Sequence, residues 1–350
     1  MVNLIDRTKL ARVVNTRTLG TTDPYSDEAA MSIIKIRDVA NANDVALDIS
    51  VDVLGCDIRC DHCFVSNASL AADYSHPSIQ SKLKKLPKAF RQARSSATEL
   101  AAYLHTKLAK SAKQHEGSGV SFSGGEPLPY RGGIKAIAEY FQTQPEPFYV
   151  NVETHGELIA LDETYLDAFE GLQDTLRFYV SIKATDDKNF ARFTGAKQGR
   201  DDAFIALERL LKRGFLATPG GVVLDCFEAP ENLNAEDNAI TRLHTRLSEI
   251  HPDLPRAIAY HSVTKGQVQA PQEQEARMRK SGYWDLRPKP VQQALLAHFA
   301  ARGTPVIMAD NTTKVKGAEY QRTATLLKDI IADLQQKGRK KTRTRERALV

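Results

Sequence analysis

The sequence predicts an α/β protein in which a mainly parallel sheet forms a partial (β/α)6 barrel. Short apolar segments alternate with longer segments of helical periodicity between residues 46 and 309. Such alternation is typical of parallel strands joined by right-handed helical crossovers. The chain has 350 residues with 42% hydrophobic content, which suits one large domain. The segments with reactive side chains all follow predicted strands, where α/β proteins bind their ligands.

The predicted elements begin with residues 1–44, which are polar and for which we expect one or two helices around a loop at Gly20–Pro24. The first strand is 46–53, where apolar and polar residues alternate. A polar loop over 64–86 and a helix over 88–113 follow. The later strands are predicted at 119–123, 148–152, 176–183, 215–224, 256–260 and 304–308, and the later helices at 132–142, 162–170, 201–213, 236–249, 290–302 and 317–336.

The positive charge of the chain is concentrated near its C-terminus. The net charge is +5, whereas residues 337–347 alone hold seven Lys or Arg and one Glu, a net +6, so the remainder is close to neutral. Such a segment can bind nucleic acid or an acidic partner, but without aromatic residues we favour a solvated, disordered tail. We therefore divide the chain into an N-terminal extension (1–44), a barrel domain (45–309), a C-terminal helix (310–336) and a basic tail (337–350).

No segment of the sequence has the pattern of a membrane anchor. The sequence lacks a run of about 18 apolar residues, and its start lacks the apolar stretch of a signal peptide. Four cysteines in 350 residues are too few for a secreted fold held by disulfides. We expect a monomeric, cytoplasmic protein without membrane contact.

Three cysteines form the pattern C-x3-C-x2-C at Cys56, Cys60 and Cys63. Three thiolates can hold three corners of a [4Fe–4S] cluster and leave the fourth iron open to a second molecule. Zinc also uses short runs of Cys and His, and His62 could complete a set of four ligands. However, His62 directly precedes Cys63, and structural zinc sites usually comprise two separated knuckles. For the remaining cysteine, Cys226, we favour a buried apolar role over a catalytic one.

A second motif, Gly124-Gly125-Glu126-Pro127, follows the predicted strand at 119–123. The two glycines allow a sharp turn and the close approach of a ligand to the backbone. The Glu126 carboxylate and the backbone carbonyls can accept hydrogen bonds from a charged amine. Pro127 stiffens the exit from the turn.

Together the two motifs resemble the radical S-adenosylmethionine (radical SAM) superfamily, in which this strand end holds the methionine amino group of SAM. The resemblance covers residues 46–309. It implies a [4Fe–4S] cluster and SAM as cofactors, with Cys56, Cys60 and Cys63 as the ligands of the cluster. It also implies cleavage of SAM to methionine and a 5′-deoxyadenosyl radical that abstracts hydrogen from a substrate. An electron donor, a flavodoxin or a ferredoxin-like protein, is the expected partner.

Three later segments are similar to the subgroup that activates glycyl-radical enzymes, and most similar to pyruvate formate-lyase activating enzyme. Residues 153–156 read Glu-Thr-His-Gly, where relatives often carry (Asp/Glu)-Thr-Asn-Gly. Residues 181–183 read Ser-Ile-Lys in place of Asp-x-Lys, and residues 260–261 read Tyr-His as in the subgroup. His155 and Ser181 depart from the pattern, and the loss of the acid at Ser181 puts the subgroup's cation site and its recognition of a glycyl loop in question.

The resemblance assigns roles to these side chains. Lys183 is expected to pair with the carboxylate of SAM, although a lysine at a strand end is ordinarily a surface residue. His261 is expected to contact the ribose or adenine, although a lone histidine is more often structural. His62 replaces an aromatic residue that relatives place near the adenine. The other residues expected to bind SAM or line its cavity are Gly124, Gly125, Glu126, Pro127, Glu153, Thr154 and Ser181.

The substrate is the least determined part of the prediction. We expect hydrogen abstraction from a glycine of a partner protein, with a small molecule, a peptide or tRNA as the alternative. A protein substrate predicts an open barrel mouth, and a small molecule predicts a mouth sealed by residues 1–44 or 310–336. A zinc or electron-transfer module without catalysis would leave the Gly-Gly-Glu-Pro motif unexplained.

Overall fold

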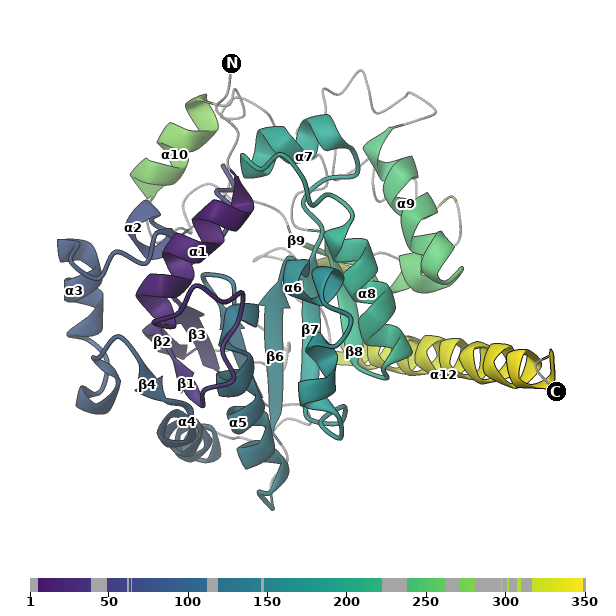
Figure 1. The fold of residues 1–350 in the computed structure, drawn as a ribbon, viewed down its shortest axis with the longest axis horizontal. Coiled ribbons are helices and arrows are strands. Elements are labelled where there is room, and N and C mark those ends of the chain that lie inside the picture. Colours follow the sequence, from purple (N-terminus) through teal and green to yellow (C-terminus); the bar gives the residue numbers. More distant parts are fainter. Residues whose placement is uncertain are drawn as a thin grey trace.

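The structure is a computed structural model, and it describes most of the chain. The described residues are 6–38, 49–61, 63, 65–111, 119–145, 148–221, 238–261, 271–280, 297, 301, 307–309 and 317–348. Within them lie one eight-stranded sheet, a two-stranded sheet and helices that pack around the large sheet (Figure 1). No helix among these residues combines the length and the apolar run that are needed to cross a bilayer.

Seven parallel strands and one antiparallel strand make up the large sheet. Its order is β10-β9-β8-β7-β6-β5-β3-β2, so each strand of this sheet lies beside the one that precedes it in the chain. Only β2, at one edge, is antiparallel to its neighbour. This order confirms the predicted α/β fold with a partial (β/α) barrel, and it brings the carboxyl ends of the parallel strands to one edge. The strands are β2 (Ile33–Asp38), β3 (Ile49–Val53), β5 (Gly119–Ser123), β6 (Tyr149–Thr154), β7 (Leu176–Ser181), β8 (Leu216–Gly221), β9 (Ala259–His261) and β10 (Ile307–Ala309).

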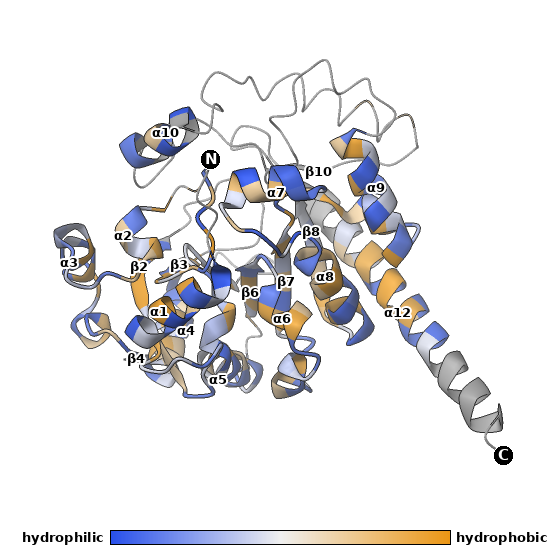
Figure 2. Cartoon of the chain, turned by 45° about the horizontal axis from the view of Figure 1, so that its top comes forward, coloured by the Kyte–Doolittle hydropathy of each residue, from blue (hydrophilic) through white to orange (hydrophobic). Residues whose placement is uncertain are grey.

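The helices between the strands each bury one apolar stripe. In α8 (Asp202–Lys212), Leu207 and Leu211 are fully buried, whereas Ile205 on the other side of the helix is exposed. Figure 2 shows the resulting division of these helices into hydrophobic and hydrophilic sides. The other connecting helices are α4 (Ala97–Ser111), α5 (Arg131–Gln142), α6 (Glu157–Leu161), α7 (Asp187–Thr194) and α9 (Ala239–Ile250).

Alternation along the strands places polar side chains inside the barrel. In β6, Val150 and Val152 are fully buried on the helix-covered face, whereas Asn151 and Glu153 lie on the opposite face and are partly exposed. The period of two residues that defines a strand produces this division. The inner face of the barrel is therefore polar at the level of these two residues.

The N-terminal extension contains one helix and two strands. Helix α1 (Arg7–Thr18) precedes β1 (Ala30–Met31), which pairs with β4 (Ser95–Ser96), and then β2. The prediction of helices alone for residues 1–44 is wrong at this point. The run Ile-Ile-Lys-Ile at 33–36 is largely β-branched, and the open edge of β3 offers it backbone partners.

Four other segments differ from the sequence-based prediction. The helix predicted at 88–113 begins only at Ala97, after a 3-10 turn and β4. The predicted loop 64–86 contains α2 (Asn67–Leu70) and α3 (Pro77–Leu83), whose first turns are capped by Ser66 and His76. Unpredicted helices are α7 and α10 (Pro271–Lys280), and most of the helix predicted at 290–302 lies outside the described residues.

The C-terminal helix is longer than the sequence predicts. Helix α12 runs over Gly317–Ala348 and packs through Leu327 and Ile330 against the region of α8 and β8 (Figure 1). It includes the basic run 337–347, so the structure has a helix where we expect a disordered tail. The division of the chain into four segments stays a prediction.

Candidate active site

The loop that follows β3 carries the three cysteines. This cysteine loop (residues 54–66) holds free thiols. The Cys56 amide donates to the Leu70 carbonyl of α2 at 3.0 Å, and the Arg59 amide donates to the Thr194 carbonyl of α7 at 3.0 Å. Two helices therefore fix the loop from two sides.

The Gly-Gly-Glu-Pro turn packs directly on the cysteine loop. Gly124 has a φ of +88°, and a Cβ atom there would lie 2.8 Å from Cβ of Asp52. A Cβ atom on Gly125 would lie 2.2 Å from the Gly55 carbonyl oxygen, and the Glu126 amide donates to the same oxygen at 2.8 Å. These glycines are therefore required by the contact between two backbone segments, whereas the sequence alone suggested close approach of a ligand.

The Glu126 carboxylate is buried and occupied by protein donors. It accepts hydrogen bonds from the Thr154 hydroxyl at 2.6 Å and from the amides of Leu128 and His155, both at 3.2 Å. Nε2 of His155 lies 3.1 Å from its second oxygen. Groups of the protein therefore contact both oxygens of this carboxylate, and the expectation that it accepts a ligand amine stays a prediction, as does that for the backbone carbonyls of the turn.

A buried charged cluster ties α1 to the cysteine loop. The Arg7 guanidinium lies within 2.9 Å of Asp57, 2.8 Å of Glu157 and 2.9 Å of Asp202. Nε2 of His155 lies 2.8 Å from Asp57. These five residues and Glu126 form what we call the rim network, because they join the loops at the carboxyl edge of the sheet.

Burial and mutual contact shift the pKa values of the titratable residues of the rim network. Burial alone would raise the pKa of Asp57, but His155, Glu157 and Arg7 hold it well below its ordinary value. Burial and the neighbouring Asp57 raise the pKa of Glu157 to about 10. Burial alone would lower the pKa of His155, but Glu126 and Asp57 raise it. The pKa values of Asp57 and Glu157 are therefore shifted in opposite directions, because His155 and Arg7 stabilise the charge on Asp57 and the charge on Asp57 opposes ionisation of Glu157.

A second polar cluster lines the inside of the barrel. Arg37 of β2 donates to Asp52 of β3 at 2.6 Å. Ser121 of β5 donates to Glu153 of β6 at 2.7 Å and accepts from Asn151 at 3.0 Å. These side chains come from four adjacent strands and face a common interior. We call Arg37, Ser50, Asp52, Ser121, Asn151 and Glu153 the interior group.

Lys183 lies between the interior group and the cysteines. Its positive charge lowers the pKa of Glu153, which burial and the nearby Asp52 raise above the ordinary value. The same charge acts on the thiols of Cys60 and Cys63. Among the described residues, no hydrogen bond or ion pair involves the Lys183 ammonium. Within the described residues, Lys183 is therefore a cation beside the cysteine loop that has no protein counterion.

Two predicted cavity residues of neighbouring strands have different orientations. Ser181 lies on the inner face at the end of β7 and pairs in register with Gly220. Thr154 lies on the outer face of β6, where its hydroxyl also accepts the Gly156 amide at 2.9 Å. Thr154 follows Glu153 directly, so the alternation of strand residues puts it on the other face from Glu153, and its contact with SAM stays a prediction.

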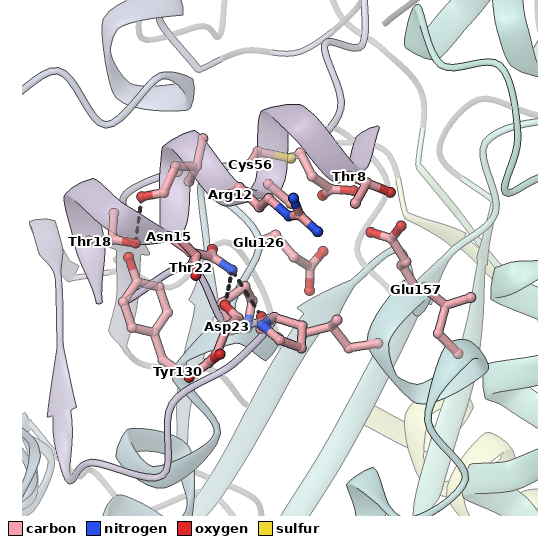
Figure 3. A pocket seen from close by; sticks show the side chains of 18 of the residues that line it. Thr8, Arg12, Asn15, Thr18, Thr22, Asp23, Cys56, Glu126, Tyr130 and Glu157 are labelled. Atoms are coloured by element: carbon pink, nitrogen blue, oxygen red, sulfur yellow. Dashed lines mark hydrogen bonds between the residues drawn. The ribbon is translucent and has the colours of Figure 1, made fainter. Parts of the chain in front are cut away.

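A cavity of about 460 Å³ is lined by residues of α1 and of the cysteine loop. Figure 3 shows Arg12 of α1 and Cys56 on its walls, with Tyr130 and Glu157 on the sides. Leu161 of α6 also lines the cavity. The cavity therefore reaches a cysteine of the loop from the side of the N-terminal extension.

Comparison with known protein families decides the assignment. The sequence profile of the Radical SAM superfamily matches residues 50–228, half of the chain. The chain belongs to the radical SAM superfamily. No curated protein matches it. A radical SAM enzyme performs radical chemistry with a [4Fe–4S] cluster and SAM, and these are its cofactors.

The cysteine loop of this radical SAM protein fits an iron–sulfur cluster. Thiolates are the soft ligands that such clusters require. Burial raises the pKa of all three thiols, that of Cys60 to about 12, so a thiolate there needs positive charge beside it. Lys183 and Arg59 act in this direction, and iron would supply the rest. Asp57 and His155 also lie near Cys56, but they are engaged with each other in the rim network.

Three residues singled out in the sequence cannot be placed fully. His62 and Cys226 lie outside the described residues. His261 ends β9, where its backbone pairs in register with Ala309 of β10, at the carboxyl edge where the other motifs lie. Their roles stay predictions.

Sequence analysis missed the residues that support the radical SAM motifs. Arg7 and Asp202 have no motif around them, and Asp57 is one of the unspecified positions of the C-x3-C-x2-C pattern. Arg277 of α10 donates to the carbonyls of Cys63 and of Val65, the latter at 3.2 Å. No local signal could have found these residues, because each acts on a segment far away in the sequence.

Proposed function

We propose that Cys56, Cys60 and Cys63 hold the [4Fe–4S] cluster and that SAM binds at the barrel mouth beside the Gly-Gly-Glu-Pro turn. The observation that carries this proposal is the direct contact between the two motifs. The Glu126 amide is bonded to the cysteine loop at 2.8 Å, at the carboxyl edge of a parallel sheet. A ligand of the open iron would therefore lie against the carbonyls of the turn.

When bound, the reduced cluster supplies the electron that cleaves SAM to methionine and a 5′-deoxyadenosyl radical, which abstracts hydrogen from the substrate. The residues of the protein bind SAM and orient it. The carbonyls of Gly124 and Gly125 accept the amine of SAM, and the Lys183 ammonium pairs with its carboxylate. Following the resemblance, His62 and His261 contact its adenine and ribose.

The interior group orients the substrate in this proposal. Burial and Asp52 raise the pKa of Glu153, so its protonated form persists to a higher pH than in a free glutamate, and in that form the carboxyl can donate to a substrate oxygen. Asp52 is 2% exposed and is paired with Arg37, so it contributes fixed negative charge to this interior. Enclosure by the barrel excludes water and competing hydrogen donors from the radical.

The proposed substrate is a glycine of a partner protein, as in the activating enzymes that the sequence resembles. Lys183 and the Tyr-His pair at 260–261 support this assignment. A small polar molecule is the second candidate, and the polar side chains of the interior group favour it. We also propose that the enzyme is a monomer in the cytoplasm, where reducing conditions preserve its cluster.

Anaerobic reconstitution tests the proposed chemistry. The protein is loaded with iron and sulfide, reduced with dithionite and supplied with SAM, and 5′-deoxyadenosine is measured. We expect product with the wild type and none with Cys60→Ala, which also loses the absorbance and EPR signal of the cluster. A reduced [4Fe–4S] cluster whose EPR signal does not change when SAM is added, with no product, would refute the proposal.

Size fractionation of a cell extract separates the two substrate classes. A protein substrate predicts that the high-molecular-weight fraction accelerates 5′-deoxyadenosine formation and acquires an EPR signal of a glycyl radical. A small substrate predicts that the dialysable fraction accelerates it. Ribonuclease treatment of the first fraction removes the stimulation only if RNA is the substrate.

A further inference from the structure

Two basic residues of β2 lie on the inner face of the barrel. Lys35 pairs in register with Asp52 of β3. Arg37 pairs in register with Ser50, to whose hydroxyl its guanidinium donates at 2.9 Å. Residues paired in this way share one face of a sheet, and both partners belong to the interior group. The edge strand of the sheet therefore presents two half-buried cations to the interior.

A third cation, Lys82, comes from helix α3, which packs beside β2 (Figure 1). Lys82 is half-buried, and its ammonium donates to the Ser69 hydroxyl at 3.3 Å. Burial lowers the pKa of Lys82, the Asp52 carboxylate opposes this shift, and the charge of Lys35 adds to it. Lys82 therefore lies near the cations of β2, and we call the three residues the basic edge: Lys35, Arg37 and Lys82.

The basic edge has few acceptors from the protein. Lys35 forms no ion pair or side-chain hydrogen bond among the described residues. Arg37 binds Ser50 and Asp52 through one and the same terminal nitrogen, and in that part of the chain its buried Nε atom has no acceptor. A buried donor without an acceptor is costly in a folded protein. The cluster therefore has donors that a ligand can satisfy.

The acids near the basic edge do not neutralise the interior. Glu273 of α10 acts on the basic edge, but it is paired with Arg277 at 3.9 Å. The other acids are Asp52 and Glu153, and Lys183 also acts on Glu153. Within the described residues, four cations thus face two carboxyl groups, an excess of two positive charges when both are ionised. In the proposed function the carboxylate of SAM balances one of them, and one is left for the substrate.

Protection of the sheet edge does not account for the whole cluster. Lysines on an edge strand discourage pairing with other chains. That role requires charges on β2 itself, whereas Lys82 belongs to α3 and approaches Asp52 from outside the sheet. Partial burial of its ammonium costs solvation free energy, which a bound anion would offset.

We propose that the basic edge is an anion-binding subsite that holds a carboxylate or phosphate group of the substrate. The proposal rests on the proposed function and names the chemical class of its second substrate candidate, a small polar molecule. Arg37 would offer the planar donors that fit such oxygens, and the two lysines would offer point charges. Fixing one end of a small molecule at β2 limits which of its C–H bonds the radical can reach.

Calorimetry tests the subsite without turnover. The probes are inorganic phosphate and succinate, titrated at low ionic strength into the full-length protein before and after it is loaded with iron and sulfide. We expect at least one probe to bind. The variant Lys35→Gln/Lys82→Gln should weaken binding about tenfold or more, because two charged contacts are lost. The variant Lys35→Arg/Lys82→Arg keeps both charges and should retain most of the affinity.

The matched control removes two charges from the end of the same helix. Lys84 and Lys85 follow α3 directly and are exposed. The variant Lys84→Gln/Lys85→Gln should bind both probes like the wild type. Absence of binding to the wild type, an equal loss in this control, or an equal loss in the arginine variant would overturn the subsite.

Anion exchange of the dialysable fraction of a cell extract gives the second test. The component that accelerates 5′-deoxyadenosine formation should be retained by the resin and eluted by salt. Its loss after treatment with alkaline phosphatase would identify a phosphate ester, and its survival would identify a carboxylate. A stimulating component that passes through the resin, or one found only in the protein fraction, would overturn the proposal.

Failure of the subsite and failure of the proposed function give different results. If dithionite and SAM yield 5′-deoxyadenosine but neither probe binds, the radical chemistry stands and the subsite is wrong. If a probe binds through the basic edge but no 5′-deoxyadenosine forms, the anion site stands and the proposed chemistry is wrong.

Discussion

The rim network and the interior group are both polar, but their side chains are satisfied to different degrees. In the rim network Arg7 alone contacts three carboxylates, and His155 bridges two. In the interior group Glu153 has one hydrogen-bond donor, Ser121, and the nearby Lys183 ammonium has no partner among the described residues. The first cluster is closed by protein contacts, whereas the second leaves polar groups that a ligand can use.

This difference assigns the two clusters to different tasks. A buried and fully bonded network holds segments in place, and breaking it costs stability. Polar groups that face a shared interior with few protein partners are the usual composition of a binding site. We therefore expect substitutions in the rim network to change folding and cluster retention, and substitutions near the interior to change catalysis.

The largest effect should follow removal of Arg7. Arg7→Met leaves the buried Asp57 and Asp202 without their cation, and we expect a loss of about 3–5 kcal/mol in the free energy of unfolding. Urea denaturation measures it. Arg12→Met, on the exposed side of the same helix, is the control and should change the stability by less than about 0.5 kcal/mol. Equal stability of the two variants would show that the rim network is not structural.

Substitution of Lys183 should separate catalysis from stability. Lys183→Met removes a cation that has no protein counterion in the described region, so the unfolding temperature should stay within about 1–2 °C of the wild type. The kcat/KM for SAM cleavage should fall about hundredfold, the usual size of a lost charged contact in an active site. Lys183→Arg should restore part of it. A variant that unfolds early but cleaves SAM normally would reverse the assignment.

Gly125 lies where the Gly-Gly-Glu-Pro turn packs on the cysteine loop, so its substitution tests that contact. Gly125→Ala places a methyl group 2.2 Å from the Gly55 carbonyl oxygen, so the turn and the cysteine loop must separate. We expect a loss of about 1–3 kcal/mol and a lower iron content after reconstitution. Gly338→Ala in α12, where a Cβ meets nothing within 4 Å, is the control and should stabilise slightly. Normal iron content in Gly125→Ala would contradict the contact.

The smallest effect should be a pH dependence at Glu153. Burial and Asp52 raise its pKa, so the folded protein holds this proton more tightly than the unfolded chain does. Its stabilising contribution is present at low pH and is lost as the pH rises through the raised value. Relative to the wild type, Glu153→Gln should therefore gain about 1–3 °C in unfolding temperature at pH 8 and little at pH 5. A gain that is greater at pH 5 would show that the carboxylate is stabilised when charged.

Much of the fold followed from local patterns. The strand at 119–123 and the helix that begins α12 were predicted closely, because strand and helix periodicities are properties of contiguous residues. The strand β2 and the helix α10 were missed. β2 has a short β-branched run but takes its backbone partners from the open edge of β3, which is distant information, and α10 is polar and carries no apolar pattern.

The family and its cofactors could be predicted from the residues alone, because the spacing of a metal-binding loop and of a Gly-Gly-Glu-Pro turn lies within a few contiguous residues. The burial of Glu126, the outward orientation of Thr154 and the contact of Arg7 with Asp202, which is 195 positions away in the chain, depend on the fold. A buried charge is stable only where other charges and donors surround it. Those partners come from distant segments, and folding alone brings them together.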